Sequence, residues 1–168
     1  MINAGILGQL KTTEKQLIEY LDRDVREIFS TMVGVEISSS HTSGTDTIFK
    51  DCVTAMVGFA GSYNGMISIN TPQKLATTFT AQMLGMDVTE CDDDVHDALG
   101  EIANMIAGSF KHRFVADGHE PQLSTPSVIS GEQYVMTVGS LTDTLSLQFE
   151  YAGENFMVNV YLEVGDAD

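Results

Sequence analysis

Five polar or small residues recur along one amphipathic stretch, DALGEIANMIAGSFK, and form a candidate chemical site. Successive members are four, three, four and three residues apart: Asp97, Glu101, Asn104, Gly108 and Lys111. At about 100° per residue, this spacing keeps all five within a band roughly 80° wide on one helix face. A glycine on such a face costs about 1 kcal/mol relative to alanine, so helix stability does not explain the pattern. We call these five residues the stripe and interpret it as a surface for contact or chemistry.

The arc opposite the stripe is apolar and is expected to face the core. It comprises Ala98, Leu99, Ile102, Met105, Ile106 and Phe110. The helix is therefore amphipathic, with the stripe on the side that a core would leave open.

Other kinds of chemistry are not favoured. His112 and His119, with Asp117 between them, invite a zinc site, but their spacing matches no standard ligand set and no cysteine lies near them. The sequence also lacks a G-x-S-x-G motif, a Walker loop and a dinucleotide-binding fingerprint. We therefore expect no metal site and no cofactor that belongs to this chain.

The composition is typical of one acidic globular domain. The 168 residues are 43% hydrophobic and 19% charged, which suits a single core within residues 1–168. The formal net charge of −16 repels phosphate backbones and anionic lipids, so nucleic-acid and membrane partners are disfavoured. No apolar run approaches the roughly 18 residues that cross a bilayer, and no basic leader precedes an apolar block. With Cys52 and Cys91 outside any C-x-x-C motif, these features predict a cytoplasmic protein with unpaired thiols.

The order of periodic segments predicts an α+β fold with an antiparallel sheet. Helices are expected at about 14–34, at 71–84 and from 92 to about 114. Thr71 is expected to cap the second helix, with Pro72 in its first turn. Strands are expected near 35–40, 51–59, 65–70, 122–130, 133–141, 144–151 and 155–163, with turns at Gly131 and Gly153. Residues 38–47 are interpreted as a polar connector, and 1–13 and 164–168 as flexible ends.

The chain also contains an internal echo. EIFSTMVG at 27–34 aligns with EIANMIAG at 101–108, with Glu27 on Glu101 and Ser30 on Asn104. Each of these helices is followed by segments that are typical of hairpins. The echo predicts two α-β-β units related by a pseudo-twofold axis, with the amide present only in the second unit.

The stripe helix resembles the signature helix of the CheC/CheX/FliY phosphatases of bacterial chemotaxis. The resemblance rests on Asp97, Glu101 and Asn104, then Met-Ile-Ala-Gly and Lys111. Two further segments agree, namely LSTPSVISG at 123–131 and an F-x-x-M-x-G-x-E motif made of Phe29, Met32, Gly34 and Glu36. The likeness covers roughly residues 17–163, is closer to the CheX branch, and implies a CheC/CheX-like fold with long helices on one side of the sheet.

This resemblance implies a phosphatase of a phosphorylated CheY-like receiver, the response-regulator domain that carries an aspartyl phosphate. Glu101 would pair with a lysine of the receiver and dock the helix, and Asn104 would orient the attacking water. The Mg²⁺ would be supplied by the receiver. Because Ser30 stands at the matching place in the first unit, that unit would be inert. CheX-like members also imply a homodimer.

The proposed roles are chemically consistent with the residue types. An acyl phosphate is already reactive, so a helper protein needs only to hold a water in line with the phosphorus. A neutral carboxamide can do this, whereas a carboxylate would be repelled by the phosphoryl oxygens. The small residues Ala107 and Gly108 would keep the helix narrow enough to approach another protein closely. Asp97 is expected mainly to support the helix start, with a partner contact as its second role. Lys111 could pair with an acid of a partner, or it could interact with the negative end of the helix dipole.

Two alternatives from other functional classes remain open. The chain could be a non-catalytic receiver-binding or scaffold module that retains the fold, and such a module would not need the amide of Asn104. It could also be a component of the flagellar switch, to which the FliY branch relates.

Overall fold

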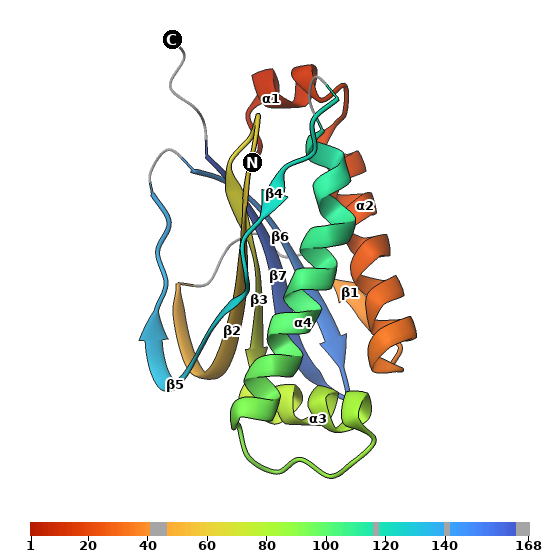
Figure 1. The fold of residues 1–168 in the computed structure, drawn as a ribbon, viewed down its shortest axis with the longest axis vertical. Helices are drawn as coiled ribbons and strands as arrows, with labels where there is room; N and C mark the ends of the chain where they lie inside the picture. Colours follow the sequence, from red (N-terminus) through yellow and green to blue (C-terminus); the bar gives the residue numbers. More distant parts are fainter. Residues whose placement is uncertain (41–46, 116–117, 140–141, 164–168) are drawn as a thin grey trace.

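One antiparallel sheet of seven strands carries two long helices across one of its faces (Figure 1). The computed structural model describes residues 1–40, 47–115, 118–139 and 142–163. The helices are α1 (Ala4–Gln9), α2 (Glu14–Ile28), α3 (Gln73–Leu84) and α4 (Asp93–Phe110), with a π turn η1 (Phe29–Val33) and a 3₁₀ turn η2 (Lys111–Phe114). The strands are β1 (Ser38–Ser40), β2 (Ile48–Ala60), β3 (Gly65–Pro72), β4 (Gln122–Leu123), β5 (Ser127–Val135), β6 (Thr142–Tyr151) and β7 (Glu154–Glu163). The expected α+β class is confirmed.

The strand order contains the pseudo-twofold repeat. The two hairpins β2–β3 and β6–β7 lie side by side, and their inner strands β3 and β7 pair at the centre of the sheet. Each hairpin follows a long helix, α2 in the first unit and α4 in the second. In addition, β1 of the first unit pairs with β6 of the second, while β4 and β5 of the second unit pair with β2 of the first. Each unit of the repeat is therefore a helix followed by strands, α-β-β-β. The strand that precedes each hairpin pairs with the hairpin of the other unit.

Helix α2 begins and ends as its sequence predicts. Thr13 and Gln16 form a capping box, in which the Gln16 amide N–H donates to Thr13 Oγ1 at 3.2 Å and the Thr13 amide N–H donates to Gln16 Oε1 at 3.1 Å. The helix continues into the π turn η1 and stops at Gly34, whose φ of 82° lies in the left-handed region. The capping box and Gly34 therefore define the two ends of the first long helix and its π turn.

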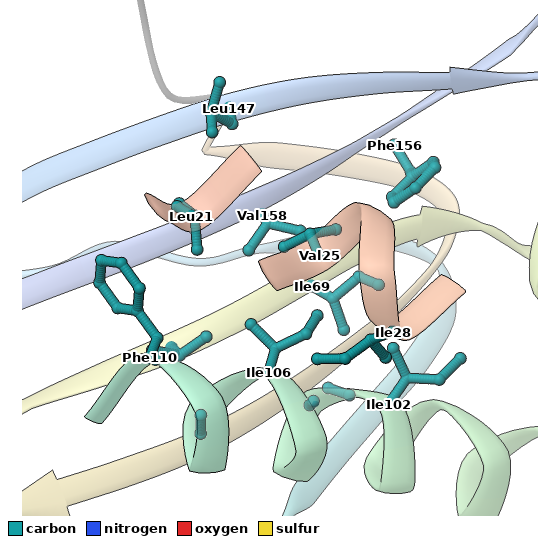
Figure 2. Close-up of a cluster of buried hydrophobic side chains, with 14 of the residues drawn as sticks. Leu21, Val25, Ile28, Ile69, Ile102, Ile106, Phe110, Leu147, Phe156 and Val158 are labelled. Carbon is teal, nitrogen blue, oxygen red and sulfur yellow. The ribbon is translucent and has the colours of Figure 1, made fainter. Parts of the chain in front are cut away.

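The core lies between the two long helices and the sheet (Figure 2). From α2 it takes Leu21, Val25 and Ile28; from α4 it takes Ile102, Ile106 and Phe110; from the strands it takes Ile69, Leu147, Phe156 and Val158. Alternate residues of each strand point to this side, as expected for a sheet with one face covered. Burial of the apolar arc of α4 leaves its opposite face to solvent.

Where the two units meet, the other face of the sheet carries a buried polar chain. Asn159 Nδ2 donates to Asn70 Oδ1 at 2.8 Å, and Asn70 Nδ2 donates to Thr54 Oγ1 at 2.7 Å. Thr54 also bonds the Tyr134 hydroxyl at 2.6 Å. Burial raises the pKa of Tyr134 to about 12, so its hydroxyl stays protonated. Because β3 and β7 are joined by side chains as well as by backbone, the units are held in one register.

The first residues are placed differently from the expected flexible end. Ile2 and Ile6 are buried against the core, and α1 occupies residues that the sequence analysis assigned to that end. The Met1 ammonium group donates to the Thr144 carbonyl at 3.2 Å, and the Asn3 amide donates to Asp143 Oδ2 at 2.6 Å. These partners are about 140 residues away, so no local pattern could have revealed them. The predicted flexible end 164–168 lies outside the described residues.

Two further local predictions were wrong. Thr71 does not cap α3, because Thr71 and Pro72 still pair with β2 and the helix begins at Gln73. Gly131 does not mark a turn, because β5 runs through it and it pairs with Cys52. In both places the ladder of β2 extends further than the sequence pattern indicated.

Candidate functional site

Helix α4 presents the stripe because its other three sides are packed. It contacts β2, β3 and β5 of the sheet and both α2 and α3. The helix starts at Asp92, whose side chain accepts from the Asp94 amide at 3.1 Å, and Asp93 and Asp94 lie in its first turn. These acids complement the positive end of the helix dipole. Asp97 is already beyond this first turn, so the expectation that it supports the helix start was wrong.

Glu101 and Asn104 are both accessible from outside. Glu101 and Asp97 are exposed, and Asn104 is half-buried on the same face. Within the described parts of the chain, neither carboxylate takes part in a salt bridge and the Asn104 carboxamide makes no hydrogen bond. The helix therefore offers an acid and, one turn later, an amide whose polar atoms bond to no other described residue.

Of the two small residues that were expected to allow a close approach, Ala107 and Gly108, only Gly108 lies on the open face of α4. A Cβ added at Gly108 would meet no heavy atom within 4 Å outside the local helix backbone, so there is open space beside this position. Ala107 is fully buried and faces the core, so its predicted role on the contact surface was wrong. Met105 is half-buried against the core and Ile106 is fully buried, as expected for the apolar arc.

Lys111 is held by its own chain. Its Nζ lies 3.3 Å from Glu120 Oε2, and His112 Nδ1 lies 2.7 Å from Glu120 Oε1. The hydrogen bonds from Lys111 and then from His112 lower the pKa of Glu120, so its carboxylate stays ionised. The sequence analysis missed Glu120, because the loop between the two residues had no periodic signal. Lys111 thus fixes a neighbouring segment to the end of the stripe.

The matching position of the first unit carries a different arrangement. Ser30 is exposed and its Oγ donates to Glu36 Oε1 at 2.9 Å, while Glu27 is also exposed. A hydroxyl engaged with a carboxylate does not offer the acceptor and donors of a free carboxamide. The only helix face with the acid and amide pattern in the described chain is that of α4.

His96 has partners that its sequence position did not reveal. Its Nε2 lies 2.8 Å from Ser130 Oγ and 3.9 Å from Cys91 Sγ, at the point where α4 begins beside β5. Burial raises the pKa of the Cys91 thiol, so it is not an activated nucleophile. Cys52 and Cys91 form no disulfide. This cluster binds the start of α4 to the sheet.

A metal site and a membrane-spanning helix are not found in the described structure. Over residues 1–40, 47–115, 118–139 and 142–163, no group of three His, Cys, Asp or Glu side chains could hold a metal ion. His112 contacts Glu120 instead, and Asp117 lies outside the described residues. None of the helices described is long and apolar enough to cross a membrane.

Comparison with known proteins places this architecture in one class. The fold is shared with CheX and CheC-like chemotaxis proteins: a chemotaxis protein CheX from Desulfovibrio desulfuricans is 28% identical, with a TM-score of 0.76, over 88% of this chain and 99% of that chain. A chain of the CheX–CheY–BeF3–Mg²⁺ complex from Borrelia burgdorferi is 23% identical, with a TM-score of 0.72, over 88% of this chain and 98% of that chain.

Sequence comparison narrows the class to a family. The model of the family described as chemotaxis phosphatase CheX matches residues 53–150, which include all of α4. The chain belongs to the CheX family. A relative named CheY-P phosphatase CheX, from Thermotoga maritima, is 22% identical over 120 residues, which are 70% of this chain and 77% of the relative.

Proposed function

We propose that this protein dephosphorylates a CheY-like receiver, with Asn104 orienting the water that attacks the aspartyl phosphate and Glu101 docking the helix. The observation that carries the proposal is the half-buried carboxamide of Asn104, which makes no hydrogen bond within the described residues and lies one turn after the exposed Glu101 on the helix that the family model covers. The relative from Thermotoga maritima is named as a phosphatase of phosphorylated CheY, and the Borrelia burgdorferi structure is a complex of CheX with CheY.

The reaction requires the phosphatase only to dock on the receiver and to position a water molecule. Water attacks the phosphorus while the bond from phosphorus to the aspartyl oxygen breaks, and the products are the receiver's free carboxylate and inorganic phosphate. The Asn104 carboxamide can accept a hydrogen bond from the water and donate to a phosphoryl oxygen, which aligns the attack. Glu101 carries a negative charge on the same face, where a lysine beside the receiver's phosphoryl site can pair with it. The receiver supplies the Mg²⁺ that neutralises developing charge, so the phosphatase needs none of its own.

The direct test measures phosphate release from a purified receiver. A chemotaxis receiver from the same organism is phosphorylated with a small-molecule phosphodonor in the presence of Mg²⁺. Addition of this protein is expected to raise the first-order rate of phosphate release by about ten-fold or more. If the receiver decays at its own rate whatever the amount of protein added, the proposal is wrong. Binding of the receiver with an unchanged phosphate lifetime would instead support the scaffold alternative.

Gly108 gives a test of how closely the partner approaches α4. A Cβ added there has no neighbouring heavy atom within 4 Å outside the local helix backbone, and alanine should stabilise the helix by about 0.5–1 kcal/mol. Gly108→Met should keep the fold but raise the receiver concentration needed for half-maximal dephosphorylation by roughly ten-fold, because the side chain would fill the contact surface. Circular dichroism and the concentration dependence of phosphate release check both effects.

The matched control for this variant is Gly8→Met, since Gly8 is also an exposed helical glycine with open space around it. It lies on α1, outside the stripe. Equal behaviour of the two variants in the receiver titration would show that the partner does not approach α4 at Gly108.

Two further properties belong to the same proposal. A chemotaxis receiver is a cytoplasmic substrate, so the phosphatase would act in the cytoplasm, where the thiols of Cys52 and Cys91, which form no disulfide, would stay reduced. The homodimer implied by the CheX-like resemblance stays a prediction, and the mass of the protein in solution would test it. The flagellar-switch alternative is less favoured, because the family model that matches residues 53–150 is that of chemotaxis phosphatase CheX.

A further inference from the structure

Alongside α4 runs a second exposed feature that the stripe does not include. Residues 120–126, EPQLSTP, follow the helix on one side in the opposite direction (Figure 1), and we call them the rim. At one end Glu120 is bonded to Lys111 at 3.3 Å. At the other end a Cβ on Gly100 would lie 3.4 Å from Pro126 Cβ, so helix and rim are in close contact there.

These two contacts place the rim beside Asn104. Gly100 and Asn104 are four residues apart and Lys111 is seven further on, so all three share one flank of the helix. Asn104 lies between the two points at which the rim touches α4. This geometry agrees with the half-buried state of Asn104 and the exposure of Glu101, which lies on the side away from the rim.

The rim is rigidly attached to the sheet. The Ser124 amide donates to the Gly58 carbonyl at 2.8 Å, and the Gly58 amide donates to Ser124 Oγ at 2.9 Å. Leu123 pairs with Phe59 and packs against the core, and Pro121 is buried. Pro121 and Leu123 are turned inward, and the exposed residues of the rim besides Glu120 are Gln122, Ser124, Thr125 and Pro126.

Charge is segregated across the stripe. The rim between residues 121 and 126 has no ionisable side chain, although the protein has a net charge of −16. The exposed acids Asp94, Asp97 and Glu101 lie on the other edge of the same helix face. A phosphoryl group with its anionic oxygens is repelled by acids and accepted beside neutral polar groups, whereas a lysine is attracted to the acidic edge.

We propose that the rim, through Thr125 and Pro126, is a second docking wall for the phosphorylated receiver, continuous with the stripe. It rests on the proposed function and adds the orientation of the complex: the receiver's phosphoryl side faces the uncharged part of the rim, residues 121–126, and its lysine faces the acidic edge. The rim adds to the affinity for the receiver that Glu101 provides, while Asn104 sets the rate of the chemical step.

The test compares two exposed threonines in the same assay. Thr125→Trp fills the rim, and Thr137→Trp, beyond the end of β5, is the matched control. Phosphate release is measured at increasing receiver concentration, with wild type and Asn104→Ala alongside. Thr125→Trp is expected to raise the KM for the receiver by about five-fold or more with kcat within about two-fold of wild type, and Thr137→Trp is expected to match wild type.

The outcomes separate this inference from the proposed function. An unchanged KM in Thr125→Trp, or a loss of kcat alone, overturns the rim as a docking wall even if wild type is active. No acceleration by wild type overturns the proposed function itself. Thr125→Gln, a smaller change at the same exposed site, serves if Thr125→Trp shows a lower melting temperature than wild type, and a KM above that of wild type is again the result expected.

Discussion

Replacement of Asn104 by alanine is expected to abolish the acceleration of receiver dephosphorylation and to leave the fold intact. The carboxamide makes no hydrogen bond within the described chain, so its removal leaves no internal group unpaired. Alanine is also a better helix former than asparagine, so stability should stay equal or rise slightly. Loss of the group that aligns the water should lower the rate of the chemical step by about 10²-fold or more, because in-line geometry is the main contribution this helper makes.

The measurement is single-turnover phosphate release at saturating Asn104→Ala protein, with the melting temperature taken in parallel. Asn104→Asp is a sharper variant, since it keeps the shape and adds a charge that the phosphoryl oxygens repel; it should be as inactive as alanine. Asn155→Ala, at an exposed asparagine on β7, is the matched control and should behave as wild type. If the Asn104→Ala protein accelerates dephosphorylation as much as wild type does, the carboxamide of Asn104 has no role in the mechanism.

The stripe could be predicted from sequence because its signal is local. Helical spacing alone places Glu101 and Asn104 on one face, and the apolar arc with Ile102 and Phe110 shows which face is buried. In the structure the apolar arc of α4 is buried and the stripe lies on the face that is left open, as predicted. The repeat was also predictable, since the echo between the two helices and the hairpin patterns together indicate two similar units.

The rest of the site depends on contacts between distant residues. Lys111 pairs with Glu120 across a loop without periodicity, and Pro126 packs on Gly100 from the edge of the sheet. The exchange of β1 and β5 between the two units is likewise a property of strand pairing, which period-two patterns do not specify. Sequence therefore predicts the chemical face of α4, while the surface around it comes from tertiary structure.

The largest expected loss of stability comes from Phe29→Ala, at the junction of α2 with its π turn. The Phe29 ring is fully buried, with its centroid 4.9 Å from that of Phe79 and 5.1 Å from that of Phe156. This cluster joins the first helix to α3 and to β7 of the second unit. Its removal leaves a cavity that rigid neighbours cannot fill, so the free energy of unfolding should fall by about 3–5 kcal/mol. Denaturant unfolding followed by circular dichroism measures the change.

Met32→Ala is the control for the same turn, because Met32 is 52% exposed and its truncation should cost no more than about 0.5 kcal/mol. A similar small loss in Phe29→Ala would mean that the cluster is not a structural junction. Since the Phe29 cluster lies on the buried side of the helices and Asn104 on the open side, Phe29→Ala should keep wild-type kcat at temperatures where circular dichroism shows it folded. A lower kcat under those conditions would instead show that the first unit, although it lacks the amide, controls the position of Asn104.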